Sequence, residues 1–285
     1  MGQSHIESVV KATTLEGAWK ARCALGTEAR FLAGGIDLAL FTPPSVKVLI
    51  DLVPLELSYV RGGESGIEVG ATTTMTDVIE SPQIASYAGG FVQEVLRQVA
   101  SPLQRNLATL GGTLARAHPW SDVIPALLVL DAEVMIFDGE ERILPLAEFY
   151  EERQRREQAL IVEVRLPRLP EGGRGAFIGF TRTGFDVALL NVACFGAIED
   201  VRWTDARIAI GGTPGLATRL RDVEAQLVDH AAAPEEITAA SESAAAAIDA
   251  RDDRRASAEF RRTLARELVA RCLLRIAELP EGGAH

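Results

Sequence analysis

The first 53 residues alternate short apolar runs with one helical stripe, which is the pattern of a β-α-β unit. Runs of strand length lie at 6–11, 29–32 and 46–51. A helical stripe separates the first two runs, with Thr13 and Glu16 at capping-box spacing before it and Gly26 at its end. The apolar positions of this stripe are Leu15, Ala18, Trp19 and Cys23. We therefore predict a small α/β subdomain that ends at about residue 53.

The pattern becomes one of hairpins and short helices between about residues 54 and 168. Apolar runs at 59–61 and 67–70 flank the glycine-rich segment 62–66 and predict a hairpin. The threonine-rich turn at 72–77 has the residue types of a helix cap. The other expected elements are helices at 84–100 and 123–130 and strands at 132–137, 142–144 and 160–166.

The last segment has strands first and helices afterwards. It begins after the Pro- and Gly-containing linker at 170–173. Strands are expected at 176–180, 188–198 and 207–210, and helices at 217–229, 235–250 and 258–278. This order predicts an α+β fold in which helices cover a small antiparallel sheet. We predict one domain over 1–168, with subdomains at about 1–53 and 54–168, and a second over 174–280.

Composition narrows the class of protein. The 285 residues carry a net charge of −11, which argues against nucleic acid as the main partner. The cysteines Cys23, Cys194 and Cys272 lie far apart, so we expect all three to be packing residues rather than ligands of an iron–sulfur cluster or of zinc. No apolar run approaches the roughly 20 residues that span a bilayer, and the N-terminus lacks a signal-peptide core. We expect a cytoplasmic protein without a membrane span.

Two pairs of glycines stand out as candidate ligand contacts. Gly34-Gly35 follows an expected strand, and Gly111-Gly112 lies in a polar turn that precedes Asp122. Glycines let a backbone approach a ligand closely, and successive N–H groups can form an anion nest. A tight turn between two packed elements needs no ligand, and this alternative stays open for both pairs. The Rossmann fingerprint GxGxxG is absent, and no helix clearly begins on Gly34-Gly35.

The chain offers little chemistry of its own. It has four histidines, of which only His118 lies in a candidate site, and it has no GxSxG motif. His and Cys residues at metal-ligand spacing are also missing. We expect no catalytic residue and no metal ligand in this chain. A dinucleotide cofactor would have to carry the chemistry.

Six segments carry a resemblance to a known family, in the family's order. They are AGGIDL (33–38), IEVGATTTMTDV (67–78), QRNLATLGGTLARAHPWSD (104–122), PALLVLDAEV (125–134), FDVALLNVA (185–193) and RIAIGGTP (207–214). With these segments the chain resembles the FAD-binding medium subunit of molybdenum hydroxylases, the group of xanthine dehydrogenase and carbon monoxide dehydrogenase. The resemblance implies a two-subdomain FAD-binding domain of the PCMH type followed by the small C-terminal domain.

The resemblance also implies roles for individual residues. Asp122 corresponds to the acid that binds the polar part of FAD, and Ile161 to an apolar position beside the isoalloxazine or adenine. Ile178 replaces a lysine found in many relatives, and Trp120 is bulkier than the expected residue. The two diphosphate loops correspond to Ala33, Gly34, Gly35, Ile36 and Asp37, and to Thr109, Leu110, Gly111, Gly112 and Thr113. In the second loop, backbone N–H groups and the last side chain are expected to meet the phosphates.

The function implied by the resemblance is electron transfer. A molybdopterin in a large subunit would oxidise the substrate, and two [2Fe-2S] clusters in a small subunit would pass the electrons to FAD in this chain. FAD would then reduce NAD, a quinone, a cytochrome or oxygen, within a dimer of heterotrimers. Two alternatives remain: a stand-alone PCMH-type flavin oxidoreductase, and an assembly subunit that has lost its flavin.

Two substitutions follow from this interpretation. Gly111→Val should abolish flavin binding while leaving the fold largely intact. Asp122→Ala should weaken binding by about 1–3 kcal/mol, the usual cost of losing a charged hydrogen-bond partner.

Overall fold

A computed structural model describes residues 5–184 and 186–278. The chain divides into two compact units, and each combines segments that are distant in sequence. The first unit contains Met1–Gln83, Ala100–Arg116 and Ala132–Pro167, and the second contains Ile84–Val99, Ala117–Asp131 and Arg168–His285.

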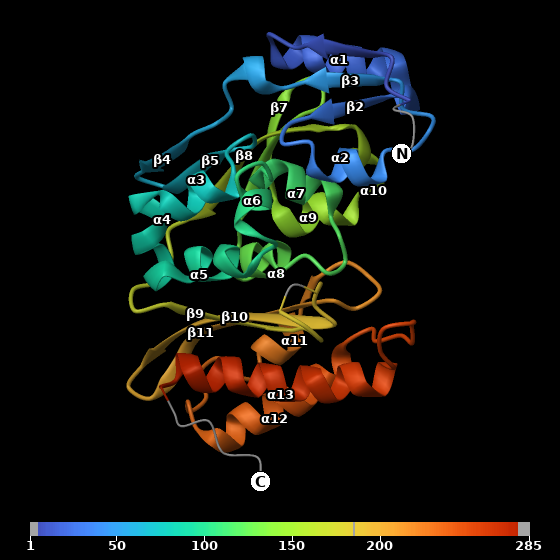
Figure 1. The fold of residues 1–285 in the computed structure, drawn as a ribbon. Coiled ribbons are helices and arrows are strands. Elements are labelled where there is room, and N and C mark those ends of the chain that lie inside the picture. The colour runs from blue at the N-terminus through green and yellow to red at the C-terminus, as the bar shows by residue number, and fades with distance from the viewer. Residues whose placement is uncertain (1–4, 185, 279–285) are drawn as a thin grey trace. The chain divides into compact units, whose positions relative to one another are not determined.

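A three-stranded parallel sheet of the first unit confirms the predicted β-α-β start (Figure 1). Its order is β1-β3-β2, with β1 at Ser8–Lys11, β3 at Val48–Asp51 and β2 at Ala29–Leu32. Helix α1, Leu15–Leu25, connects the first two strands, and Gly26 ends it with a φ of 54°. The predicted cap was one residue early, because the side chain of Thr14 accepts the N–H of Gly17 at 3.0 Å. The predicted packing role of Cys23 is wrong, since that residue is exposed.

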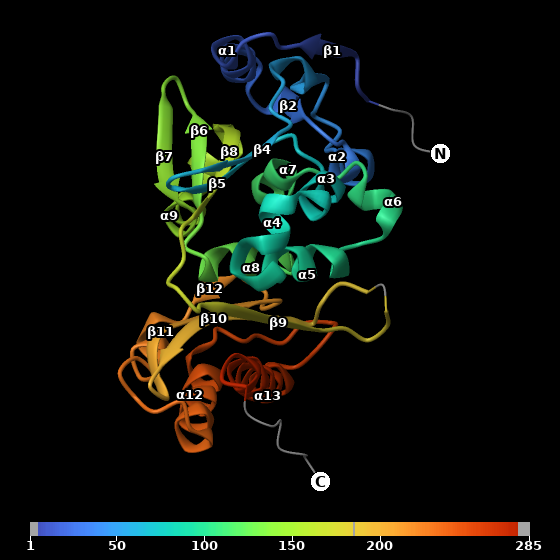
Figure 2. The same cartoon turned by 90° about the vertical axis from the view of Figure 1, so that its left-hand side faces the viewer.

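A five-stranded antiparallel sheet forms the rest of the first unit's framework (Figure 2). Its order is β4-β5-β8-β6-β7. The strands are β4 (Val60–Gly63), β5 (Gly66–Gly70), β6 (Glu133–Phe137), β7 (Glu141–Pro145) and β8 (Leu160–Pro167). The predicted hairpins 59–61/67–70 and 132–137/142–144 are both confirmed. The unit's helices after α1 are α2 (Ile36–Phe41), α3 (Met75–Glu80), α6 (Pro102–Arg105), α7 (Leu110–Arg116), α9 (Leu146–Glu151) and α10 (Arg153–Gln158).

The second unit is a four-stranded antiparallel sheet with helices on both faces (Figure 1). The sheet order is β12-β11-β10-β9, from Thr218–Arg219, Arg202–Gly211, Leu190–Glu199 and Arg174–Phe180. Helices α12 (Pro234–Ala247) and α13 (Ala258–Ile276) cover one face, which confirms the predicted α+β arrangement. Helices α5 (Phe91–Gln98) and α8 (Val123–Val129) cover the other face, although they come from earlier in the chain.

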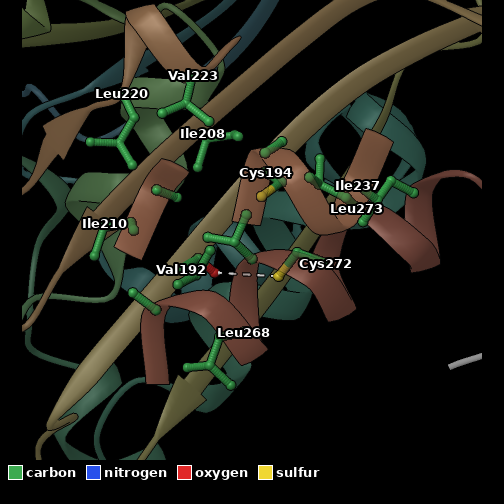
Figure 3. Packing of buried hydrophobic residues seen from close by; sticks show 14 of the residues in the cluster. Val192, Cys194, Ile208, Ile210, Leu220, Val223, Ile237, Leu268, Cys272 and Leu273 are labelled. Atoms are coloured by element: carbon green, nitrogen blue, oxygen red, sulfur yellow. Dashed lines mark hydrogen bonds between the residues drawn. The ribbon is translucent and has the colours of Figure 1, made fainter. Parts of the chain in front are cut away.

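The apolar core of the second unit lies between its sheet and helices α12 and α13 (Figure 3). Cys194 on β10 and Cys272 on α13 are fully buried there, and the Cys272 thiol lies 3.8 Å from the Val192 carbonyl oxygen. The predicted packing role is therefore confirmed for these two cysteines.

Two predicted helices differ from the structure. The segment predicted as helix 217–229 instead contains β12 and the short α11, Arg221–Glu224. The predicted helix 84–100 is interrupted after α4, Pro82–Ser86, because Ala88, Gly89 and Gly90 adopt positive φ. None of the described helices is long and apolar enough to cross a bilayer.

Candidate functional site

The first glycine loop joins β2 to α2. Gly35 has a φ of 73° and occupies the N-cap position of α2 without a side-chain cap. A helix therefore begins directly on this loop, which the sequence analysis did not predict. Within residues 5–184 and 186–278, no protein acceptor is found for the N–H groups of Gly34, Gly35 and Ile36. Three backbone donors at a helix start are suited to an anionic group.

The second glycine loop is the first turn of α7 rather than an isolated turn. Its N–H groups have acceptors inside the protein: Leu110 donates to the Thr73 carbonyl at 3.1 Å, and Gly111 to the Ala71 carbonyl at 2.9 Å. The N–H of Gly112 donates to Oγ1 of Thr109 at 3.2 Å, and that of Thr113 to the Thr109 carbonyl at 3.0 Å. Direct donation from these N–H groups to phosphate would require shared hydrogen bonds. Gly112 is the exposed position of this loop, whereas Gly111 is buried.

The first loop lies against the backbone that directly precedes the second loop, inside the first unit. A Cβ added to Gly34 would fall 1.7 Å from the carbonyl oxygen of Leu107 and 3.4 Å from Cα of Ala108. No side chain fits there, so a glycine is required for this approach. The structure thus places the first loop against Leu107 and Ala108, the two residues before the second loop.

Gly111 has a different reason to be a glycine. A Cβ at this position would lie 2.6 Å from Cβ and 2.7 Å from the carbonyl oxygen of Ala71, which follows β5. The residue lets α7 pack against that backbone. The expectation that Gly111→Val leaves the fold intact is therefore wrong, because the new side chain would meet protein backbone.

The donor set of the first loop fits a diphosphate. Its N–H groups have no acceptor in the described part of the chain, and Gly34 has no side chain that would cover them. An arginine on α7 lies near the start of α2. Arg116 of α7 approaches the carboxylate of Asp37, with Nε 3.9 Å from Oδ1, and its guanidinium lies 5.6 Å from the ring centroid of Phe41. These groups would hold negative charge by hydrogen bonding and by Coulomb attraction.

Asp122 precedes α8, as predicted, and belongs to the second unit. Its carboxylate does not cap that helix. Loss of water around the carboxylate raises the pKa of Asp122 to about 6, while a hydrogen bond from Asn191 opposes that rise. The Asn191 Nδ2 lies 2.7 Å from Oδ1 of Asp122.

Asn191 is a residue that the sequence analysis did not single out. It lies on β10 and is fully buried between apolar neighbours. The signal was present in the sequence, since one amide interrupts the apolar run of 188–195. A buried amide in such a strand requires hydrogen-bond partners.

The remaining predicted residues belong to several elements of the two units. Ile161 is buried on β8 of the first unit. The ring of Trp120 stacks on that of His118, with centroids 4.6 Å apart and planes 17° apart. Ile178 packs against the apolar core of the second unit. Thr74 caps α3 through the N–H of Asp77 at 3.1 Å, which is the structural role suggested for this turn.

The chemistry available in the described residues is that of binding. No group of three or more His, Cys, Asp or Glu side chains in them has the arrangement of a metal site. In the first unit, backbone donors and one arginine can hold a phosphate group. In the second unit, the carboxylate of Asp122 can accept hydrogen bonds.

Comparison with known proteins identifies similar sequences and folds. Residues 4–169 match the family described as the FAD binding domain in molybdopterin dehydrogenase, and residues 176–276 match the CO dehydrogenase flavoprotein C-terminal domain. The chain is 30% identical over 275 residues to the 6-hydroxypseudooxynicotine dehydrogenase complex subunit alpha of Paenarthrobacter nicotinovorans, covering 93% of this chain and 92% of the relative. It is 28% identical to the carbon monoxide dehydrogenase medium chain of Hydrogenophaga pseudoflava, covering 87% and 89%. A solved structure of carbon monoxide dehydrogenase from that organism superposes with a TM-score of 0.88 at 26% identity. The superposition covers 96% of this chain and 97% of the chain in that structure.

Proposed function

We propose that this chain, which belongs to the family of FAD-binding subunits of molybdopterin dehydrogenases, accepts electrons from a partner subunit and passes them through FAD to an external acceptor. Family membership makes the chain a flavoprotein and an oxidoreductase subunit of the molybdenum hydroxylase type. The transfer route and the partners are the proposal. The observation that carries it is the first glycine loop. Its N–H groups lack an acceptor in the described part of the chain, and its Gly34 lies against the backbone just before the second loop.

The chain's own residues would bind and orient the cofactor. The N–H groups of Gly34, Gly35 and Ile36 would donate to the diphosphate. The backbone at Gly112 is exposed and carries no side chain. In the second unit, the resemblance assigns Asp122 as the acceptor of hydrogen bonds from hydroxyl groups of FAD. FAD, when bound, supplies the redox chemistry, since isoalloxazine accepts and releases electrons.

Partner subunits follow from the same assignment. Relatives of this chain are named as a complex subunit or a medium chain. We propose a small iron–sulfur subunit as electron donor and a large molybdopterin subunit as the site of substrate oxidation. We place this complex in the cytoplasm as a dimer of heterotrimers.

The first test is a visible absorption spectrum of the purified chain after incubation with FAD and desalting. Wild-type protein should retain flavin bands. Gly112→Val should lose them, because its side chain would project from the exposed position of the second loop. Within the protein, its Cβ meets only the Thr109 hydroxyl, at 2.7 Å. Gly63→Val on the β4–β5 hairpin is the matched control, since its Cβ meets only the Gly66 carbonyl oxygen at 3.9 Å.

The outcome also separates the alternatives. Reduction of bound flavin by NADH or a small substrate in the isolated chain would favour a stand-alone flavin oxidoreductase. Absence of flavin even in the co-expressed complex would favour an assembly subunit. Equal flavin retention in Gly112→Val and wild type would contradict the proposed diphosphate site.

A further inference from the structure

We propose that Asn191 is a positioning residue that holds Asp122 as a carboxylate and thereby sets the pH range in which the chain binds FAD. The effect on FAD binding rests on the proposed function. The effect of Asn191 on Asp122 concerns two side chains of the second unit and can be tested without any ligand.

The amide of Asn191 is oriented by the backbone rather than by Asp122 alone. Its Nδ2 donates to the Ser121 carbonyl oxygen at 3.2 Å and lies 3.5 Å from the Trp120 carbonyl oxygen. These carbonyls accept only, so they fix the nitrogen side of the amide toward the 120–122 turn. The N–H group that reaches Oδ1 of Asp122 at 2.7 Å is therefore a donor whatever the state of the carboxyl. A fixed donor favours the charged form of an acid.

The surrounding backbone keeps this amide in place. The N–H of Gly212 donates to the Pro119 carbonyl oxygen at 2.7 Å, which ties the end of β11 to the same turn. A Cβ on Gly211 would lie 2.4 Å from Oδ1 of Asn191, so the amide fills its space completely. Oδ1 itself is buried and has no hydrogen-bond partner in the described part of the chain. An amide that leaves one atom unsatisfied costs stability, and a role for its other atom explains its presence.

Charged side chains do not provide an alternative cause. Among the described residues, only burial and Asn191 act on the pKa of Asp122. Helix α8 has no charged residue from Val123 to Val129. The titratable groups on the turn and on the elements packed against α8 either contact other side chains or are exposed. The ring of His118 stacks on Trp120, and Glu94 and Arg97 of α5 are exposed. The others form ion pairs: Arg207 and Arg219 with Asp131, Asp205 with Arg207, and Arg182 with Asp186.

The test uses the full, flavin-free chain with ¹³C-labelled aspartate carboxyl groups. The Asp122 resonance is assigned by its loss in Asp122→Asn, and its titration midpoint is followed by NMR. We expect a midpoint of about 6 in the wild type and a rise of about one pH unit or more in Asn191→Leu, which removes the donor. Asn106→Leu, at an exposed asparagine of the first unit, is the matched control and should leave the midpoint unchanged.

Asn191→Ala also removes the donor, and its smaller side chain makes it the second variant to use where Asn191→Leu does not fold. An unchanged midpoint in the folded variants would overturn the proposal. FAD affinity measured across the same pH range should fall with the protonation of Asp122 and shift with it. A shifted midpoint with pH-independent FAD affinity would overturn the link to binding. Failure of wild-type protein to bind FAD at any pH would instead contradict the proposed function and leave the NMR result to decide the role of Asn191.

Discussion

At the scale of single residues, the two neighbouring glycines of α7 have different structural roles. Gly111 faces the backbone of Ala71, whereas Gly112 is exposed. The sequence predicted that both would meet a ligand, because a Gly-Gly pair gives no sign of which residue faces inward. The packing of α7 against Ala71, forty residues earlier in the chain, determines which glycine faces inward.

This difference predicts that the same substitution changes the free energy of unfolding by different amounts at the two glycines. Gly111→Val should lower the free energy of unfolding by about 1–3 kcal/mol or more, because overpacking against fixed backbone is costly. Gly112→Val should change it by less, since the hydroxyl of Thr109 can turn away. Urea unfolding followed by circular dichroism would compare the two. Equal stabilities of both variants would contradict the packing described for α7.

Asp122 predicts a pH-dependent stability. The pKa of the Asp122 carboxyl is near its ordinary value of 3.8 in the unfolded chain and about 6 in the folded chain. Between these values the folded state holds more protons, so the free energy of unfolding falls as the pH rises, by at most about 3 kcal/mol. Asp122→Asn has no such proton. Its stability relative to wild type should therefore be higher at pH 7.5 than at pH 4, measured by urea unfolding at both values. The same difference at both values would argue against a raised pKa.

At the scale of elements, a buried ion pair attaches the edge strand β12 to α8 and α11 of the second unit. Nε of Arg219 lies 2.6 Å from Glu224, and Nη1 lies 2.6 Å from Asp131 and 3.1 Å from the Leu128 carbonyl oxygen. Glu224 also accepts the N–H of Ile208 at 2.8 Å. These bonds explain why a helix predicted over 217–229 is replaced by a strand and one short turn of helix.

Removing one partner of this pair should be costly. Arg219→Met would leave the buried Glu224 without its counter-charge and should lower the free energy of unfolding by about 3–5 kcal/mol. The double variant Arg219→Met/Glu224→Met should recover part of that loss. Arg251→Met, in an exposed pair with Asp249, is the control and should cost about 1 kcal/mol or less. Thermal or urea unfolding would rank the variants, and a small effect of Arg219→Met alone would contradict the role given to the pair.

At the scale of the whole molecule, local patterns predicted well and long-range packing did not. The strands at 6–11, 132–137 and 160–166 were found because their apolar runs are bounded by turn residues. The break at Gly89-Gly90 was missed because the apolar spacing continues across it. Helices α5 and α8 were found approximately, but the sheet they cover begins only at Arg174. Hydrophobic periodicity shows that a face is buried and does not show against what. The candidate site residues show the same contrast between local and long-range signals. Both glycine pairs were singled out from the local sequence, whereas the hydrogen bond between Asn191 and Asp122, 69 residues apart, was not predicted.

The divided second unit has a consequence for the order of synthesis. All seven residues of α8 are buried, and the helix packs on β10 and β11. The ribosome completes α8 at Val129, but β11 ends only at Gly211. At 5–20 residues per second, this helix waits roughly 4–16 seconds for the strands that cover it. During translation the nascent chain therefore exposes an uncharged apolar helix, which makes this interval the time when a chaperone would bind the chain.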